Sequence, residues 1–231
     1  MKDKIWYLSN HNLFQGMIEE DFSDVVHVTQ EYTVDKYKPI FLPGDPVKNI
    51  YFIKNGKVKI SSISEDGKQL TMAILGNQDI FGELSLIGQK KQTTIAEAIE
   101  NTYLCYIKKE DFESLLKKSP ILSFKITKQI GLKLQNIENR IENIVFLDTM
   151  TRLVTLLLDL SKKYGIETKY GIEISLPLTH EEIGQLIAVN RQTVTTKLNE
   201  LKQKELIDIK RSQIIIKDIN KLESISKHAV F

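Results

Sequence analysis

The sequence contains little cysteine and no long apolar run. Cys105 is the only cysteine among 231 residues, so the chain cannot form an internal disulfide or supply a cluster of thiolates to zinc. No segment approaches the roughly 18 consecutive apolar residues that a membrane-spanning helix requires. The first residues, MKDKIWYLSNHNLF, contain neither the apolar core nor the cleavage site of a secretory signal. These absences predict a cytoplasmic protein without a membrane partner.

Motifs of catalysis are also missing. The chain has no nucleophile elbow, no metalloprotease helix and no glycine-rich nucleotide loop. Glu181 and Glu182 form a carboxylate pair in sequence only, because adjacent residues of a helix point in different directions. We therefore expect no enzymatic activity, no metal site and no cofactor.

The composition is that of a globular protein with almost balanced charge. Hydrophobic residues make up 42% of the chain and charged residues 27%, and the formal net charge is +2. A chain of this length can bury a sizeable core and has room for two domains. Because the charge is balanced, any argument for nucleic acid has to come from the arrangement of residues.

The N-terminal half is expected to change from helix to short antiparallel strands. Residues 5 to 27 have a helical pattern whose buried side is Ile5, Leu8, Leu13, Phe14, Met17, Ile18, Phe22 and Val25. From about Glu31 to Ile107, β-branched and aromatic runs alternate with turn signals such as Asn55-Gly56, which favour hairpins. The predicted strands are 40–42, 50–53, 58–60, 70–74, 94–96 and 103–107. Many short strands at even spacing predict a barrel, sandwich or roll.

Two helices are expected after these strands. The first, from Lys109 to Lys118, is short and amphipathic, and the second runs from Pro120 to about Val145. Aliphatic residues recur along the second helix at spacings of 4, 3, 4 and 3, namely Ile130, Leu134, Ile137, Ile141 and Ile144. Such spacing is typical of the a and d positions of a coiled coil, so it predicts a homodimer. The alternative is a helix that packs on its own β-rich domain.

The C-terminal part is predicted to contain two short helices joined by a tight turn. A helix from Asp148 to about 164 and a strand over 172–178 precede them. Thr179 and Glu182 form a capping box for the first short helix, and Asn190 is a suitable N-cap for the second. The buried face of the second helix is Val194, Leu198 and Leu201.

The outward face of the second short helix suits DNA, because no acidic residue occurs from Ala188 to Asn199. Arg191 can bridge a guanine edge and Gln192 can pair with adenine, whereas Thr195 and Thr196 suit phosphates or thymine methyls. The first turn of a recognition helix is where such contacts fall in helix-turn-helix proteins. The alternative is the solvated face of an ordinary helical hairpin.

A basic hairpin follows the two helices. Two isoleucine-rich runs, 207–209 and 214–216, flank Lys210-Arg211-Ser212-Gln213. This pattern is typical of the wing of a winged helix, in which Lys210 and Arg211 rest on phosphate; the alternative is a solvated turn. Asp218 is expected to cap a last helix that ends near Lys227.

These motifs resemble the CRP/FNR superfamily of bacterial regulators. The C-terminal match consists of Thr179, Glu182, Ile183, Gly184, Arg191, Thr193, Val194 and the pair Leu206-Ile207. The N-terminal match, to a cyclic-nucleotide-binding β-roll, consists of Pro43-Gly44-Asp45, the hairpin at 52–56 and the run from Asp79 to Leu84. The resemblance implies an α+β protein with a β-roll over 1–118, a dimerisation helix over 119–146 and a winged helix-turn-helix domain over 147–231.

The resemblance further implies a homodimeric, sequence-specific DNA-binding transcription regulator, with RNA polymerase as another partner. The β-roll, with an effector or without one, would set whether the two recognition helices can enter successive major grooves. The alternative is a nucleotide-binding sensor whose C-terminal domain contacts a protein. Bases would be read by Arg191, Gln192 and Thr196. Phosphates would be touched by His180, Asn190, Thr193 and Arg211.

The region that corresponds to the family's ligand site departs from the family pattern. In the family, the residue at Gly82 exposes backbone donors, the one at Glu83 holds a ribose hydroxyl, and an arginine grips the cyclic phosphate. Gln92 stands in the arginine's place here, and a neutral amide cannot make a charge-assisted fork with phosphate. Lys90 or Lys91 can substitute only as a point charge. The alternative is that Gly82 and Glu83 are present because the backbone of the turn requires them, and not because they bind a ligand.

A second departure lies on the long helix, where Ile137 and Glu138 replace the hydroxyls that touch adenine in the family. Together the two departures argue against a cyclic AMP response. The effector-pocket candidates are Gly82, Glu83, Leu84, Gln92, Thr93, Ile137 and Glu138.

Gas sensing, known elsewhere in the family, lacks its ligands here. An iron–sulfur cluster needs four thiolates, whereas Cys105 is alone in an apolar stretch and is interpreted as a buried structural thiol. A haem-sensing relative needs a histidine near the hinge-facing loop, and none occurs between Asn49 and Val145.

Overall fold

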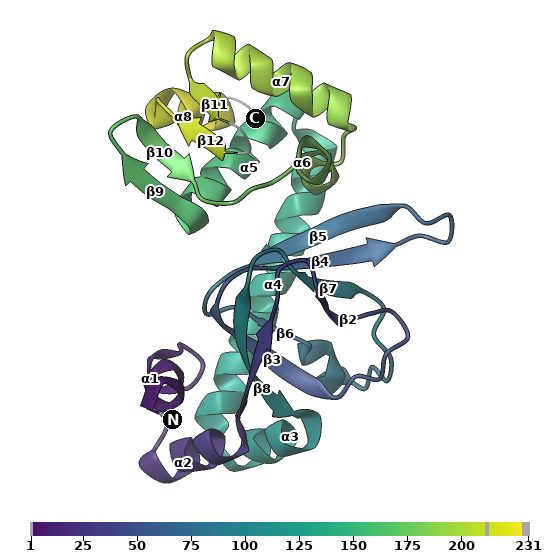
Figure 1. The fold of residues 1–231 in the computed structure, drawn as a ribbon, viewed down its shortest axis with the longest axis vertical. Helices are drawn as coiled ribbons and strands as arrows, with labels where there is room; N and C mark the ends of the chain where they lie inside the picture. The colour runs from purple at the N-terminus through teal and green to yellow at the C-terminus, as the bar shows by residue number, and fades with distance from the viewer. Residues whose placement is uncertain (1, 211–212, 228–231) are drawn as a thin grey trace. The chain divides into compact units, whose positions relative to one another are not determined.

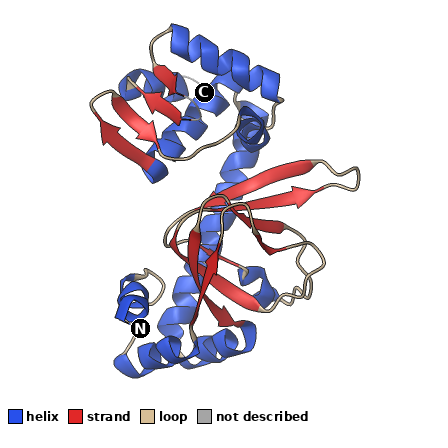
Figure 2. Ribbon diagram, in the orientation of Figure 1, coloured by secondary structure: helices blue, strands red, loops and turns tan. Residues whose placement is uncertain are grey.

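The computed structural model describes residues 2–210 and 213–227, and the chain forms two compact units, Met1–Leu134 and Gln135–Phe231 (Figure 1). Each unit combines helices with antiparallel strands (Figure 2), which confirms the predicted α+β class. Among the described residues, no helix has the length and apolar character that crossing a membrane needs.

The first unit contains two four-stranded sheets, with the orders β1-β8-β3-β6 and β2-β7-β4-β5. All strand pairs within them are antiparallel. The strands are β1 (Gln30–Val34), β2 (Pro39–Phe41), β3 (Asn49–Asn55), β4 (Val58–Ile63), β5 (Gln69–Leu75), β6 (Ile80–Phe81), β7 (Ile95–Ala98) and β8 (Thr102–Lys108). The six predicted strands are confirmed, and a short 3₁₀ helix η1 (Glu83–Ile87) follows β6. The sequence pattern did not indicate β1 and β6.

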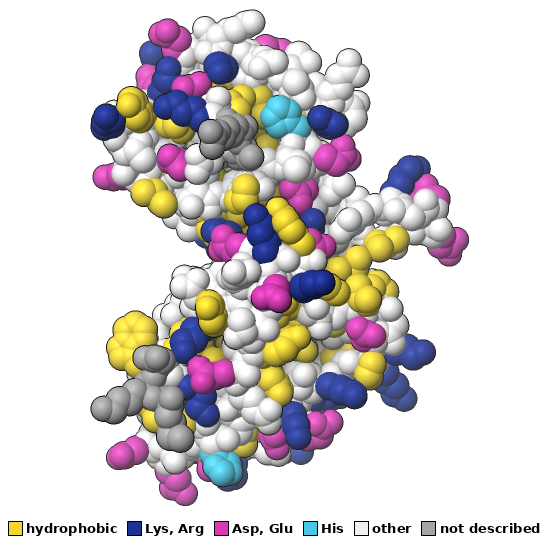
Figure 3. Space-filling view, in the orientation of Figure 1, with side chains coloured by type: hydrophobic (Ala, Val, Ile, Leu, Met, Phe, Trp, Pro, Cys, Tyr) yellow, Lys and Arg dark blue, Asp and Glu magenta, His cyan; other side chains and the backbone are white. Residues whose placement is uncertain are grey.

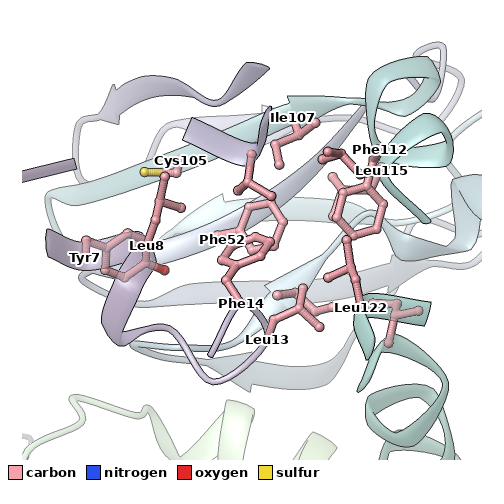
Figure 4. Packing of buried hydrophobic residues seen from close by; sticks show 14 residues of the cluster. Tyr7, Leu8, Leu13, Phe14, Phe52, Cys105, Ile107, Phe112, Leu115 and Leu122 are labelled. Carbon is pink, nitrogen blue, oxygen red and sulfur yellow. The ribbon is translucent and has the colours of Figure 1, made fainter. Parts of the chain in front are cut away.

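Strand β3 separates two hydrophobic cores because successive side chains of a strand point to opposite faces. Tyr51 and Ile53 join a core that draws on both sheets, with Val34, Phe41, Val58, Phe81, Ala96, Ala98 and Leu104. Ile50 and Phe52 join a core between the first sheet and the helices, with Tyr7, Leu8, Leu13, Phe14, Phe112, Leu115 and Leu122 (Figure 4).

The N-terminal segment forms two helices, α1 (Lys2–Asn10) and α2 (Glu19–Val28), and a third, α3 (Lys109–Lys118), follows β8. The prediction that Ile5 and Ile18 are buried was wrong, because their side chains are 41% and 65% exposed. A turn with Gly16 at φ 76° interrupts the expected helix, so the periodicity of one helix does not continue into the next.

His11 lies in this turn and is fully buried. Its ring lies between 5.4 and 5.5 Å from the rings of Tyr7, Phe14 and Phe52, and its Nδ1 accepts a hydrogen bond from the Leu13 backbone N–H at 3.2 Å. Burial lowers its pKa from 6.5 to about 4, so the imidazole is neutral at neutral pH.

The long helix α4 (Pro120–Phe146) contributes its first part to the first unit and its last part to the second. Leu122 and Ile126 are buried in the first unit. The predicted seam is exposed in the single chain, with exposed fractions of 39% for Ile130, 56% for Leu134, 56% for Ile137, 58% for Ile141 and 39% for Ile144.

The second unit packs helices on a four-stranded sheet of order β11-β12-β10-β9. Its elements are α5 (Thr149–Tyr164), β9 (Gly165–Thr168), β10 (Gly171–Ile174), α6 (His180–Ile187), α7 (Arg191–Gln203), β11 (Ile207–Lys210), β12 (Gln213–Ile216) and α8 (Ile219–Lys227). Asp148 caps α5 and Asp218 caps α8, as predicted.

The predicted strand over 172–178 ends early, at Ile174. Beyond it the Leu176 and Leu178 N–H groups bond to carbonyls only two residues back, at 2.8 and 2.9 Å, so this stretch makes tight turns instead of a ladder. Pro177 between them has no N–H to donate to a neighbouring strand.

Candidate nucleic-acid interface

The first helix of the helix-turn-helix, α6, is fixed at its start by the predicted capping box. The Thr179 hydroxyl accepts from the Glu182 backbone N–H at 3.1 Å, and the Glu182 carboxylate accepts from the Thr179 N–H at 2.9 Å. Side chains therefore satisfy two donors that have no partner within the helix. Ile183 and Ile187 are buried, which leaves one face of α6 toward solvent.

The turn between α6 and α7 is tight. Ala188 ends α6 in the left-handed region, at φ 57°. A Cβ on Gly184 would come within 2.5 Å of the Val189 carbonyl oxygen, so only glycine fits where the turn crosses α6. Asn190 then caps α7, its side-chain oxygen accepting from the Thr193 N–H at 2.8 Å as predicted.

Two arginines from other helices hold the C-terminal end of α6. Arg140 on α4 donates to the Gln185 carbonyl oxygen at 2.9 Å, and Arg152 on α5 donates to the Ile187 carbonyl oxygen at 2.9 Å. The last carbonyls of a helix lack intrahelical partners and carry the negative end of its dipole, so a guanidinium suits them. Sequence reasoning missed both arginines, because their partners lie 45 and 35 residues away and no local pattern signals the contact.

Helix α7 has the predicted buried and exposed faces. The buried side chains are Val194, Leu198 and Leu201, none more than 1% exposed. The outward face has Arg191, Gln192, Thr196 and Asn199 exposed and Thr195 half-buried. The first carboxylate of the helix is Glu200, which is paired with Lys197 at 2.8 Å. The surface from Asn190 to Asn199 therefore offers amides, hydroxyls and a guanidinium without a carboxylate.

The threonine hydroxyls of this face are bonded within the domain. Thr196 donates to the Gln192 carbonyl oxygen at 3.1 Å, and Thr195 donates to the Arg191 carbonyl oxygen at 3.0 Å. His180 Nδ1 lies 2.8 Å from the Thr195 hydroxyl oxygen. Because that hydroxyl proton goes to Arg191, Nδ1 is the donor in this contact, which leaves His180 Nε2 for an external partner.

The remaining predicted phosphate contacts lie at the start of α7 and in the wing. The Thr193 hydroxyl donates to the Asn190 side-chain oxygen at 2.9 Å, which leaves the Asn190 NH₂ group available to an external acceptor. Lys210 is exposed at the end of β11, with its Nζ 4.2 Å from the centre of the Tyr170 ring. Arg211 lies outside the described residues.

In the first unit, the motif that resembles a nucleotide cassette has partners of its own. Gly82 has φ 85°, and a Cβ there would come within 2.5 Å of the Asn49 carbonyl oxygen, so the backbone alone requires glycine. The Glu83 side chain is 11% exposed, and its carboxylate pairs with Lys133 of α4 at 2.7 Å. The same ammonium group donates to the Ile80 carbonyl oxygen at 2.8 Å.

The other effector-pocket candidates differ in exposure. Gln92 is buried, at 7% exposed, whereas Thr93 is exposed and Leu84 is 50% exposed on η1. Ile137 and Glu138 are exposed on the part of α4 that belongs to the second unit. That these residues form a pocket stays a prediction.

Cys105 is fully buried on β8, as expected of a structural thiol. Burial raises its pKa to about 11, so it is protonated and unreactive at neutral pH. Within residues 2–210 and 213–227, no group of three His, Cys, Asp or Glu side chains is placed to hold a metal ion.

Two family models match separate parts of the chain. The model described as a cyclic nucleotide-binding domain matches residues 33–119, and the one described as a Crp-like helix-turn-helix domain matches residues 151–225. These ranges contain, respectively, most of the two sheets of the first unit and the whole of α6 and α7.

Whole-chain relatives agree with these matches. The chain is 33% identical to the global nitrogen regulator of Nostoc sp. over 207 residues, which are 89% of this chain and 91% of that protein. It is 26% identical over 215 residues to a CRP-like cAMP-activated global transcriptional regulator of Mycobacterium tuberculosis, or 93% and 96% of the two chains. A CooA variant from Carboxydothermus hydrogenoformans has a similar structure, with a TM-score of 0.75, 26% identity and coverage of 95% and 97%. The chain therefore belongs to the CRP/FNR family, and it is a transcription regulator with a helix-turn-helix DNA-binding domain.

Proposed function

We propose that this regulator binds a two-fold-symmetric DNA site as a homodimer, with one α7 helix in each of two successive major grooves, about 34 Å apart. The observation that carries the proposal is the exposed face of α7, which has no carboxylate from Asn190 to Asn199. A carboxylate there would repel phosphate, and its absence leaves only groups that pair with DNA.

Base readout is assigned to the first turns of α7. Arg191 matches guanine O6 and N7, and Gln192 matches adenine N6 and N7. Thr196 has its hydroxyl proton bonded to its own helix, so it offers its methyl group to thymine. The Asn190 NH₂ group fits a phosphate beside the groove, whereas His180 Nε2 donates to a phosphate only from an imidazole that carries both ring protons.

Dimerisation is supported by α4. Five aliphatic side chains at a and d spacing, from Ile130 to Ile144, are each at least 39% exposed in the single chain. Exposing such a row of aliphatic side chains to water is unfavourable, and a second copy of α4 supplies a matching apolar surface that covers it.

The first unit does not respond to cyclic AMP in this proposal. Gln92 provides no charge for a cyclic phosphate, and the Glu83 carboxylate is already paired with Lys133. The β-roll instead controls DNA affinity through another effector, or holds the dimer active without one. The DNA-bound dimer then acts on RNA polymerase at the promoter.

The test is a selection of bound duplexes from a random DNA pool, with purified full-length protein, no added ligand and near-physiological salt. The expected result is an enriched two-fold-symmetric site with half-sites one helical turn apart. The same selection with cyclic AMP should enrich the same site to the same extent.

Enrichment only in the presence of cyclic AMP would overturn the argument from Gln92 and Glu83. Failure to enrich any duplex under both conditions, together with binding to a protein partner through the second unit, would replace DNA readout with the sensor alternative.

A further inference from the structure

The helices of the DNA-binding domain are joined to the dimerisation helix by a short link. Helix α4 ends at Phe146 and α5 begins at Thr149, so only Leu147 and Asp148 lie between them. A few residues between two helices can absorb a change in backbone angles, which redirects everything that follows them. The covalent link alone therefore does not fix the direction of the recognition helix relative to α4.

A side chain of α4 makes a second connection that bypasses this link. Arg140 precedes the link, and its guanidinium donates to the Gln185 carbonyl oxygen in the last turn of α6 at 2.9 Å. Within α6 the Val189 N–H would be the partner of this carbonyl, but it bonds to the Gly184 carbonyl oxygen instead, at 2.9 Å. Arg140 therefore holds a carbonyl that the helix itself does not use.

Helices α6 and α7 form one rigid piece because the turn between them is closed. A Cβ on Gly184 would lie 2.5 Å from the Val189 carbonyl oxygen, and Asn190 caps α7 by accepting from the Thr193 N–H at 2.8 Å. Helix α5 packs against both α6 and α7. A guanidinium that holds the end of α6 therefore also holds the helix that is proposed to read the bases.

On α4, Arg140 is a neighbour of the predicted dimer seam. Residues three and four positions apart share one side of a helix, so the Arg140 side chain lies next to Ile137 and Ile144. These two side chains are 56% and 39% exposed in the single chain, and a second copy of α4 is proposed to cover them. The same turns of α4 thus hold the second copy and, through Arg140, the end of α6.

Arg152 makes a similar contact on the other side of the link. Its guanidinium donates to the Ile187 carbonyl oxygen at 2.9 Å, two residues beyond the carbonyl that Arg140 holds, and to the Thr149 hydroxyl oxygen at 3.4 Å. Because α5 follows the link, Arg152 joins two helices of the DNA-binding domain to each other. Of these two arginines, Arg140 is the one that spans the link.

Both contacts leave the reading face of α7 open. Arg191, Gln192 and Asn199 are exposed, and the surface over α7 in Figure 3 consists mostly of side chains that are neither charged nor hydrophobic. We propose that Arg140 is a positioning residue, which fixes the direction of α7 relative to the dimer seam and thereby the spacing of half-sites that the dimer accepts. This inference rests on the proposed binding of a two-fold-symmetric site and names the residue that sets its spacing.

The test compares wild type, Arg140→Met, Arg140→Lys and Arg152→Met in the full-length protein. Each binds duplexes whose half-sites stand at the selected spacing, one base pair closer or one base pair further apart. One base pair moves a half-site by about 3.4 Å and turns it by about 35° around the duplex, so a rigid dimer distinguishes the three. Arg152→Met is the matched control, because it removes a similar contact that does not involve α4. Thermal unfolding checks that each variant is folded, and Arg140→Ala replaces Arg140→Met if the latter is not.

We expect wild type to bind the selected spacing about ten-fold or more tightly than either neighbour, because a hydrogen bond from a charged group contributes about that factor. Arg140→Met should bind all three spacings within about three-fold of one another, since the link then adjusts to each. Arg140→Lys retains a cationic donor and should restore most of the preference. Arg152→Met should weaken binding by a similar factor at every spacing and keep the preference.

A pair of spin labels reports the direction of α7 in the free dimer, without DNA. Asn199→Cys places one label on each α7, and it is combined with each arginine variant. Asn199 is exposed, whereas Cys105 is fully buried and unreactive, so the label attaches at position 199. The distance between the two labels should have a narrow distribution with Arg140 present and with Arg152→Met, and a broader one with Arg140→Met.

An unchanged preference for the selected spacing in Arg140→Met would overturn the positioning role, as would the same distribution of label distances with and without Arg140. An equal loss of preference in Arg152→Met would also overturn it, because loosening of the domain would then be a sufficient cause. Failure of the proposed function is distinct, because wild type itself would then bind no selected duplex or would bind single half-sites as a monomer.

Discussion

The nucleotide-cassette motif of the first unit and the recognition helix of the second both carry residues typical of the family, but their side chains are used differently. Contacts inside the unit explain both residues of the first motif. The close Asn49 carbonyl requires a glycine at Gly82, and the Glu83 carboxylate is paired with Lys133. On α7, the family residue Arg191 is exposed to solvent, as is its neighbour Gln192, which is not part of the family match. A motif residue thus indicates ligand binding only when its polar atoms are left for a ligand.

Both regions are proposed to work within a dimer, so the largest effect is expected from a substitution that prevents dimerisation. Ile137→Lys places a charge in the predicted seam of α4, which should weaken dimerisation by at least about 100-fold, because an unpaired buried charge costs several kcal/mol. Light scattering should show a monomer, and DNA affinity should fall with it. Asn139→Lys, an exposed position off the seam, is the control; an unchanged mass for Ile137→Lys would rule out the seam.

Acid should destabilise the first unit more than the second, because His11, which is fully buried, belongs to the first. The folded pKa of His11 is about 4 against an ordinary 6.5, so between these values the unfolded chain binds a proton that the folded unit does not. Stability of the first unit is therefore full above pH 6.5 and falls by roughly 3 kcal/mol as the pH drops to about 4.

Urea unfolding followed at several pH values checks this dependence. His11→Asn keeps an acceptor for the Leu13 N–H and removes the titration, so it should start less stable but lose less stability between pH 6.5 and 4. The same pH dependence in both proteins would show that another group is responsible.

Substitution of Lys133 or Glu83, one at a time, tests the ion pair inside the cassette motif. Lys133→Met leaves the largely buried Glu83 carboxylate without a cation and should lower the stability of the first unit by roughly 1–3 kcal/mol. Glu83→Gln removes the charge that needs pairing and should cost less. Thermal unfolding measures both, and the reverse order of stabilities would mean that the ion pair does not hold Glu83.

Base readout by the exposed face of α7 is tested by substituting Gln192. Gln192→Ala should cost roughly 1–3 kcal/mol on the selected sequence and relax the preference at one base pair of each half-site. A repeated selection with the variant shows which base pair is affected. An equal decrease in affinity on all sequences would assign Gln192 to the backbone instead of a base.

The smallest effect is expected at Thr196, where only a methyl group is proposed to meet the DNA. Thr196→Ser removes this methyl and should weaken binding about four-fold for each half-site, close to the 0.8 kcal/mol of one buried CH₂ group. Thr196→Val keeps the methyl and should bind within about two-fold of wild type. Weaker binding by the valine variant and unchanged binding by the serine variant would show that the hydroxyl is the contacting group.

Local signals predicted most of the fold. The turn glycine at Gly56, the capping box of α6 and the Asp148 cap each act over a few residues, so the pattern of the sequence contains them. Strands β1 and β9 were missed because most of their side chains are exposed and no apolar alternation marks them.

Interactions over long sequence separations could not be predicted in the same way. The pair of Lys133 with Glu83 joins positions 50 residues apart, and nothing near either residue indicates the other. The contact of the Lys210 ammonium group with the Tyr170 ring likewise joins positions 40 residues apart, in the turn between β9 and β10 and at the end of β11. The candidate DNA-reading residues were predictable because they share one helix, whereas their supports come from elsewhere in the chain.

The hydrogen bond from Arg140 to the Gln185 carbonyl affects where the chain can be truncated to give a stable DNA-binding fragment. A DNA-binding fragment that begins at residue 147 lacks Arg140, one of the two arginines that hold the end of α6, although it keeps Arg152 and every residue proposed to touch DNA. A fragment that begins at residue 135 retains it, but it also carries the exposed Ile137, Ile141 and Ile144. The last turns of α4 thus support the C-terminal end of α6, and the shortest stable fragment that binds DNA should include them.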